Sequence, residues 1–158
     1  MEVLYEREKA VEYARKWAFS RNPAYYNFDS LGGDCTNFAS QCLYAGAPVM
    51  NYTRDTGWYY ISLNNRAAAW TSAEYFKRFM LRNTGIGPVC EKKSPFELEI
   101  GDFISLVSDG RSYHTLIAVG FDNGMPLIAA HTYNAFMRQL DSYYYEDAIG
   151  IHIKYSNK

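Results

Sequence analysis

The fold is decided by the stretch FISLVSDGRSYHTLIAVGFDNGMPLIAAH, which occupies residues 103–131. Its β-branched and aromatic residues alternate with period two, as in strands that turn one face to a core. Asp-Gly and Asn-Gly steps interrupt this alternation, and such steps favour tight hairpin turns. The stretch therefore predicts an antiparallel meander. With one later segment of the same kind, the expected strands are 103–107, 113–121, 126–131 and 149–155.

Upstream of the meander, the apolar residues recur at helical spacing. They do so over residues 3–19, where charged residues take the opposite face. The pair Gly32-Gly33 then breaks regular structure, and Asp34 stands as the N-cap of a helix expected over residues 35–45. Two amphipathic helices are thus predicted before the first strand of the meander.

A third helix is expected to begin after Thr71, which has Glu74 at the capping-box position, and to close at Gly85. The segment before it is polar, aromatic and irregular, with a short strand expected over residues 58–61. Helices come first in the chain and the sheet second. This segregation predicts an α+β fold, with N-terminal helices packed on a curved antiparallel β-sheet.

Length and charge exclude several classes of protein. The chain has 158 residues, which we expect to form a single domain over residues 1–158. A formal charge of -1, from 16 basic and 17 acidic residues, lacks the electrostatic footprint of a nucleic-acid or anionic-membrane binder. No apolar stretch approaches the roughly 20 residues of a membrane span. No signal peptide is expected at the N-terminus, although the natural protein could be a longer exported one.

Three cysteines, Cys35, Cys42 and Cys90, are too few for a disulfide framework, so at least one thiol is free. Cys35 is the candidate nucleophile because the glycine pair delivers it to a helix N-terminus. There, unpaired N–H groups and the macrodipole stabilise a thiolate and can donate to an oxyanion. The negative charge of Asp34 opposes the thiolate unless its carboxylate is turned to cap the helix.

Two histidines of the meander supply the other candidate catalytic residues. His114 lies early in the second strand, on the face shared by Leu116, and we expect it to point toward the helix that carries Cys35. His131 ends the next strand, near the His114 end of its neighbour. In a Cys-His-polar triad, His114 accepts the thiol proton and His131 orients the imidazole. Asn134 is the alternative for the orienting role.

The segment GDCTNFASQCLYAG, residues 33–46, resembles the signature of the bacterial putative amidase domain family. Similarity extends over nearly the whole chain, through Arg21-Asn22-Pro23, Tyr25-Tyr26, Trp70, Gly101-Asp102, His114 and Ala130-His131-Thr132. That family is similar in turn to the papain-like clan of NlpC-type endopeptidases and CHAP amidases. The resemblance implies a papain-like, CHAP-like fold that hydrolyses amide bonds, often in peptidoglycan. It also implies Cys35 as nucleophile, His114 as base and a polar third residue, with His131 in that place by strand position.

The resemblance leaves the oxyanion hole and the substrate contacts open. The glutamine that precedes the papain nucleophile has no counterpart here, because Asp29 and Ser30 stand at its place. Tyr26, Asn27 or backbone groups are the alternatives. An aromatic cleft wall that contacts sugar or peptide is expected to include Trp58 and Trp70, with Tyr26 as a further substrate-binding candidate, although core packing explains the tryptophans equally well.

The sequence thus predicts a cysteine amidase or peptidase without cofactor, which acts through a thioester. The resemblance alone implies bacterial cell-wall peptide as its substrate class. One alternative keeps the triad and resolves the thioester with an amine, as an acyltransferase does. Another is a zinc site made by Cys35, His114 and His131. A third is a non-catalytic module that binds cell-wall polymer. The sequence does not specify the oligomeric state.

Overall fold

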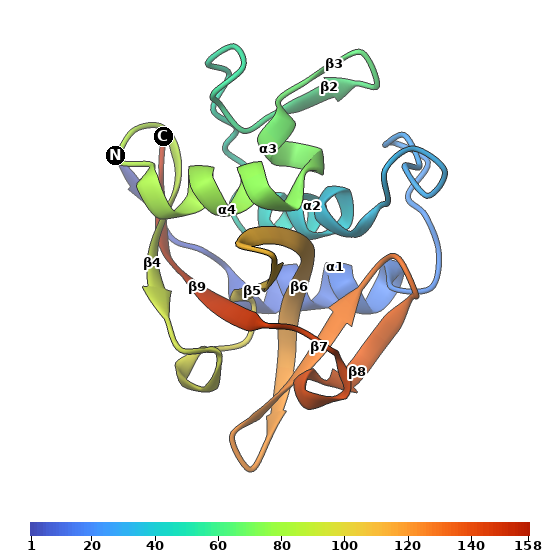
Figure 1. Cartoon of the computed structure of the whole chain (residues 1–158). Coiled ribbons are helices and arrows are strands. Elements are labelled where there is room, and N and C mark those ends of the chain that lie inside the picture. Colours follow the sequence, from blue (N-terminus) through green and yellow to red (C-terminus); the bar gives the residue numbers. More distant parts are fainter.

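The computed structural model describes residues 1–158 and is α+β (Figure 1). Its helices are α1 (Arg7–Trp17), α2 (Cys35–Gly46), α3 (Ala68–Thr71) and α4 (Ala73–Arg82), with short 3-10 turns η1 (Pro95–Glu97) and η2 (Leu140–Ser142). Its strands are β1 (Glu2–Val3), β2 (Tyr60–Ser62), β3 (Asn65–Arg66), β4 (Gly87–Lys93), β5 (Phe103–Ser108), β6 (Arg111–Asp122), β7 (Met125–Ala130), β8 (Ala135–Gln139) and β9 (Asp147–Asn157). No helix is both long and apolar enough to cross a bilayer.

The predicted meander is confirmed. Strands β5, β6 and β7 are antiparallel neighbours in a seven-stranded sheet of order β1-β9-β5-β6-β7-β8, in which β4 also pairs with β9. The β5–β6 turn has positive φ at Asp109 and Gly110, and the β6–β7 turn has it at Asn123 and Gly124. Two consecutive positive φ angles define the tight hairpin turn that Asp-Gly and Asn-Gly favour.

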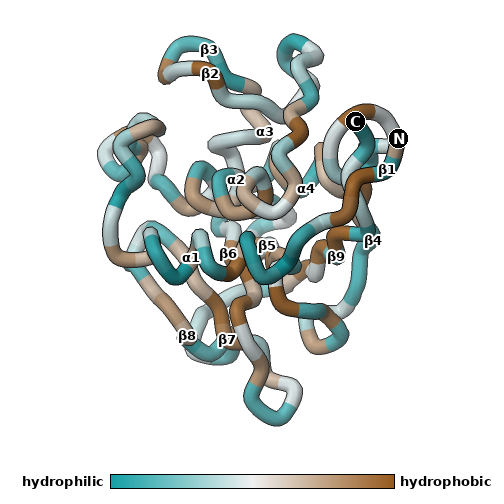
Figure 2. Tube along the Cα trace, turned by 180° about the vertical axis from the view of Figure 1, so that it is seen from behind, coloured by the Kyte–Doolittle hydropathy of each residue, from teal (hydrophilic) through white to brown (hydrophobic).

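Both faces of the sheet are covered. Helices α1, α2 and α4 pack on one face, where Phe103, Ile117 and Ile151 meet residues such as Phe38. The other face carries a smaller core that includes Leu116 and is closed by residues of the loops beyond the strands. The hydrophobic colouring of Figure 2 concentrates along the central strands accordingly. Strand β6 therefore presents neighbouring residues to two different cores, as the alternation of side chains in a strand requires.

Several elements differ from the sequence-based expectation. The first helix is shorter than residues 3–19, because Glu2–Val3 pairs with the end of β9 instead. Strands β4 and β8 were not predicted. The third helix has Ser72 at its N-cap without a side-chain cap, and Glu74 accepts a hydrogen bond from the backbone N–H of Ser112 at 2.7 Å. The expected capping box is therefore absent, because Glu74 faces the sheet.

The two ends of the chain lie side by side. Glu2 pairs with Asn157 and Val3 with Ser156, and the amino group of Met1 lies 3.4 Å from the carbonyl oxygen of Lys158. In Figure 1 both ends stand on the left, whereas α2 begins on the right, next to the loop that precedes it. The candidate nucleophile is thus carried at the opposite side of the fold.

Candidate active site

Cys35 is the first residue of α2, as predicted, and remains partly exposed. Its nearest polar side chain is Thr36, with Oγ1 3.7 Å from Sγ. The backbone of Thr115 in β6 is close enough to lower the pKa of the thiol. Strand β7 pairs with β6 only from Ile117 onward, so the β7 side of β6 is unpaired at Thr115.

The thiol is the resting form of Cys35. Burial raises the pKa of Cys35, and the charge of Asp34 adds a small contribution in the same direction. Hydrogen bonds from the backbones of Thr115 and Thr36 lower this pKa but do not outweigh the burial. Desolvation of the charged form therefore outweighs the stabilisation that the helix N-terminus offers a thiolate.

His114 lies in β6 directly before Thr115, but its ring faces away from the helices. It is paired with Leu106 and shares a face with Leu116, and both leucines belong to the smaller core. The expectation that this face turns toward α2 is wrong, because α2 covers the opposite face, where Thr115 contacts Thr36. Cys35 and His114 nevertheless share a neighbour, because the Tyr143 ring lies 5.7 Å from the His114 ring, centroid to centroid, and the pKa of Tyr143 is also raised by Cys35.

The His114 ring lies in a mostly apolar and aromatic environment. It is 8% exposed and makes no side-chain hydrogen bond. Tyr113 stacks near one side, with ring centroids 6.4 Å apart, and Tyr143 lies on another, with centroids 5.7 Å apart. Burial, together with a smaller contribution from the positive charge of Arg138, lowers the pKa of His114 to about 4. The imidazole is therefore neutral at pH 7, and one of its ring nitrogens can accept a proton.

His131 does not reach His114. Its Nδ1 is 2.5 Å from Oδ2 of Asp34, and its Nε2 is 2.7 Å from the carbonyl oxygen of Trp17. The ring also stacks on Phe38, with centroids 3.9 Å apart. Both ring nitrogens are thus occupied by other partners. The expectation that His131 orients the imidazole of His114 is not met, because this ring belongs to the helix face of the sheet, opposite His114.

Asn134, the alternative orienting residue, is also held elsewhere. Its Oδ1 accepts a hydrogen bond of 2.8 Å from Arg21, which in turn forms two bonds of 3.0 Å with the carboxylate of Asp29. Arg21 also lies 3.6 Å from Oδ2 of Asp34. These residues form a network behind the candidate nucleophile and fix the loop that leads into α2.

Asp34 occupies the N-cap position but does not cap the helix with its side chain. Its Oδ1 accepts hydrogen bonds of 2.9 Å from the backbone N–H of Phe28 and from Nδ2 of Asn37. Its Oδ2 faces His131 and Arg21. The carboxylate is therefore buried among donors, and this explains why its effect on the neighbouring thiol is the smallest of those that act on it.

The two tryptophans expected to line a substrate cleft lie in the core instead. Trp58 and Trp70 are fully buried, with ring centroids 4.7 Å apart. Their indole N–H groups donate to Ser40 and Asn37, which are buried polar residues of α2. Trp58 and Trp70 therefore cannot contact a substrate. Asn37 and Ser40, which follow Cys35 in α2, are structural because they accept hydrogen bonds from buried indole N–H groups.

Tyr26 remains at the surface, at 39% exposed. Its backbone N–H donates to Tyr60, and its carbonyl accepts from Asn37. Tyr26 is thus a surface aromatic residue of the loop that leads to Cys35. Asn27, another oxyanion candidate, uses its side-chain oxygen to bind the backbone of Asp29.

Two residues near His114 were not singled out in the sequence. Tyr143 follows η2, and its hydroxyl is buried without a hydrogen-bond partner. The guanidinium of Arg138, in β8, lies over the Tyr143 ring, with Cζ 3.7 Å from the centroid. A cation centred over the ring face is not in line with the hydroxyl, so it contributes charge rather than a hydrogen bond. No local sequence signal marks either residue, since β8 and η2 bring them to His114 only through the fold.

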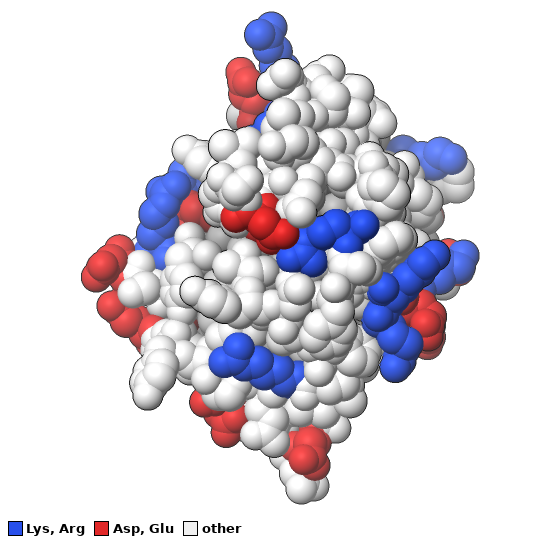
Figure 3. Space-filling view, turned by 90° about the vertical axis from the view of Figure 1, so that its right-hand side faces the viewer, with Lys and Arg blue, Asp and Glu red and all other residues white.

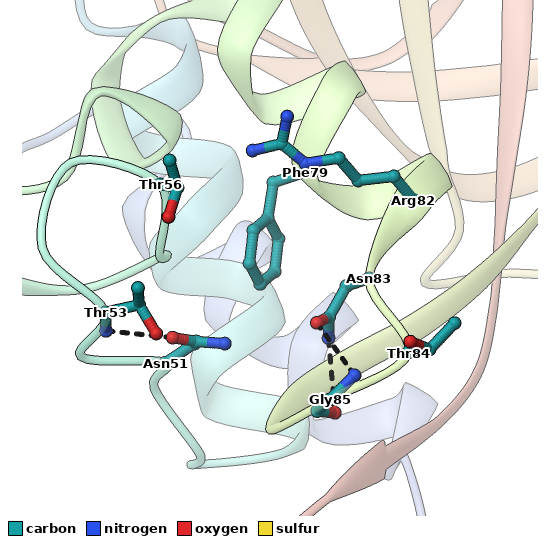
Figure 4. A pocket seen from close by; sticks show the side chains of 8 residues that line it. All are labelled: Asn51, Thr53, Thr56, Phe79, Arg82, Asn83, Thr84 and Gly85. Carbon is teal, nitrogen blue, oxygen red and sulfur yellow. Dashed lines mark hydrogen bonds between the residues drawn. The ribbon is translucent and has the colours of Figure 1, made fainter.

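The surface hollows of the molecule lie elsewhere. The pocket in Figure 4 is formed by residues 51–56 and the end of α4, where Asn83 holds the backbone of Gly85. Figure 3, which shows the right-hand side of the view in Figure 1, has scattered charged groups separated by wide uncharged areas. No three His, Cys, Asp or Glu side chains come together as a set able to hold a metal ion. The zinc alternative is therefore not supported, because His131 is engaged with Asp34 and Trp17.

The chain is an α+β domain with a cysteine at the N-terminus of α2 and a histidine in strand β6. Residues 4–154 match the family described as "Putative amidase domain", and the chain belongs to that family. No solved structure matches the chain.

Two proteins of Bacillus subtilis (strain 168) are similar to the chain. The uncharacterized protein YhbB is 40% identical over 149 residues, which cover 91% of this chain and 46% of YhbB. The uncharacterized protein YjcM is 28% identical over 152 residues, which cover 96% of this chain and 33% of YjcM. The chain thus spans less than half the length of these relatives.

Proposed function

We propose that this chain is a cysteine-dependent amide hydrolase of papain-like, CHAP-like type, with Cys35 as nucleophile and His114 as base. One observation carries the proposal. Cys35 at the start of α2 and His114 in β6 both lie near Tyr143, and the His114 ring is neutral and makes no side-chain hydrogen bond. Acyl transfer needs at least a nucleophile and a base that can take the proton from it.

Because Cys35 is a thiol and His114 is neutral, the proposed mechanism uses general base catalysis and not a preformed thiolate–imidazolium pair. His114 takes the proton from Sγ as the sulfur attacks the amide carbonyl carbon. The oxygen becomes an oxyanion, and the backbone N–H groups in the first turn of α2, which have no helical partner, can donate to it. His114 then gives its proton to the departing amine, which leaves a thioester on Cys35. Water, deprotonated by His114, releases the acid and restores the thiol.

His131 has a different role in this proposal from the one expected in the triad. It binds Asp34, the residue before the nucleophile, and so fixes the junction between the glycine pair and α2. Bacterial cell-wall peptide is the proposed substrate class, by resemblance to amidases of the papain-like clan. A soluble or cell-wall-bound acceptor amine in place of water would make the same chemistry an acyl transfer.

The proposal is tested with muropeptide mixtures as substrate and the release of new amino groups as readout. Cys35→Ala and His114→Ala should each lower turnover by about a thousandfold or more, whereas Cys90→Ala, a matched control on β4, should keep it. A thioester mass on Cys35 should be trapped at low pH. Equal loss in all three variants would refute the assignment. Product that incorporates an added amine would point to the acyltransferase, and unchanged cell-wall binding without turnover would point to the binding module.

A further inference from the structure

Two arginines near the candidate site, Arg21 and Arg138, differ in whether an acidic side chain pairs with them. Arg21 is neutralised, because it forms two hydrogen bonds of 3.0 Å with Asp29. Arg138 forms no ion pair with any carboxylate. Its side chain is only partly buried, so its charge remains available at the surface. An arginine that lacks an acidic partner beside a nucleophile and a base is a candidate for recognition of an anion.

The guanidinium of Arg138 is held in place before any ligand binds. Its Nε donates to Oγ of Ser142 at 2.7 Å, and its Nη2 donates to the carbonyl oxygen of Ser142 at 3.2 Å. The Ser142 hydroxyl is itself bound to the carbonyl oxygen of Gln139 at 2.7 Å. The plane of the guanidinium rests on Tyr143. These contacts hold the guanidinium and leave Nη1 without a hydrogen bond, so Nη1 is free to donate to a ligand.

The same tyrosine connects Arg138 to the reacting groups. The Tyr143 ring lies 5.7 Å from the His114 ring, centroid to centroid, and carries Arg138 on its face. The charge of Arg138 affects the pKa values of both His114 and Tyr143, and that of Tyr143 also responds to Cys35. Only the Tyr143 ring therefore lies between Arg138 and His114, where the scissile amide of a substrate would bind.

We infer that Arg138 is a specificity-determining residue that binds a carboxylate of the substrate close to the scissile amide. This inference rests on the proposed function and narrows its substrate class to acidic peptides, in which a free carboxylate lies near the bond that is cleaved. Arginine suits this role because its planar donors match the two oxygens of a carboxylate. The interaction supplies binding and orientation and leaves the proton transfers to His114.

The inference is tested without turnover by comparing two alkylating reagents, iodoacetate and iodoacetamide, which differ mainly in a negative charge. Their rates at Cys35 are measured at one alkaline pH that is the same for both reagents, and they are assigned by peptide mass spectrometry. The ratio of the two rates cancels the thiolate fraction. In Arg138→Gln we expect the iodoacetate-to-iodoacetamide ratio to fall about two- to fivefold, as for a partly exposed charge pair. Arg138→Lys should retain most of the ratio.

Arg54→Gln is the matched control, because Arg54 is exposed on a different loop and carries the same charge. It should leave the ratio unchanged. A ratio equal in Arg138→Gln and the wild type would overturn the inference, since a merely structural arginine slows both reagents alike. A Cys35 that neither reagent reaches would overturn it too, because the inference requires an open path past Arg138. If Arg138→Gln lowers the ratio of alkylation rates as expected, but turnover does not depend on His114, the proposed function is rejected instead.

Discussion

Thr36 and Thr115 share a hydrogen bond of 2.9 Å between their hydroxyls, and each directly follows one of the proposed catalytic residues. Both threonines are buried. The bond ties the first turn of α2 to β6 at the open edge of the strand. It thereby holds Cys35 and His114, which project from different elements and toward different faces, in one fixed relation.

This bond gives the first prediction. Thr36→Val keeps the shape of the side chain but leaves the hydroxyl of Thr115 buried without its partner, which should cost about 1–3 kcal/mol of stability. Turnover should fall at least tenfold at a temperature where the variant is fully folded, because positioning errors of an ångström are costly in acyl transfer. Thermal unfolding and turnover measured together check it. A variant that is destabilised but fully active would show that the bond only stabilises the fold.

The lowered pKa of His114 gives the second prediction. The folded value is about 4, against about 6.5 in the unfolded chain, so the unfolded state binds more protons between these values. Stability is therefore complete above pH 6.5 and falls as the pH drops toward 4, by about 3 kcal/mol from this residue. Urea unfolding of the wild type and His114→Gln at several pH values measures the difference. Parallel pH profiles for the two proteins would contradict the burial effect.

The same pKa sets the acid side of the activity profile. Turnover requires neutral His114, so kcat/KM should rise with pH through about 4 to 5 rather than near 6.5. An inflection near 6.5 would mean that His114 titrates as an exposed histidine when substrate is bound or that another group limits the rate.

The third prediction concerns His131. His131→Ala removes the partner of a buried carboxylate and should cost about 3 kcal/mol of stability. Folded protein should keep turnover within about tenfold of the wild type, in contrast to His114→Ala, because His131 acts through Asp34. Asn134→Ala, at the edge of the same network, should change stability by less than 1 kcal/mol. A stable but inactive His131→Ala protein would return this residue to the catalytic set.

The fourth prediction separates core tryptophans from substrate contacts. Trp70→Phe loses the 3.0 Å hydrogen bond to Oδ1 of Asn37 and should cost about 1–3 kcal/mol, with KM unchanged. Tyr26→Ala, in the exposed loop before Cys35, should leave stability nearly unchanged. Its KM is compared with that of Trp70→Phe. A raised KM in Trp70→Phe without loss of stability would contradict the buried position of the ring.

Local patterns predicted the parts of this fold that local chemistry determines. The Asp109-Gly110 and Asn123-Gly124 turns, the strands that they join and the helix that begins at Cys35 all follow from short-range signals. Strand β4 was missed because Gly87-Pro88 reads as a turn, and its pairing with β9 joins residues far apart in the chain. Val3 was assigned to a helix for the same reason, since only pairing with β9 makes Glu2–Val3 a strand.

The site was predicted in part. Cys35 has a strong local signal in its glycine pair and helix start, so its position was predicted. The face of His114 was not, because the alternation of β6 does not say which of its two cores lies beneath the helices. The partners of His131 and the neighbours of Arg138 depend on loops that close only in the folded chain. Aromatic richness could not distinguish the buried Trp58 and Trp70 from surface residues.

The adjacency of the chain ends has a consequence for engineering. A short flexible linker could join Lys158 to Met1, since their backbones already meet beside β9. New ends could then be opened at the exposed Asn123-Gly124 turn, and the order of elements along the polypeptide would change while every strand kept its neighbours. Such a circularly permuted protein should fold with Cys35 and His114 in place, because neither residue depends on where the polypeptide starts.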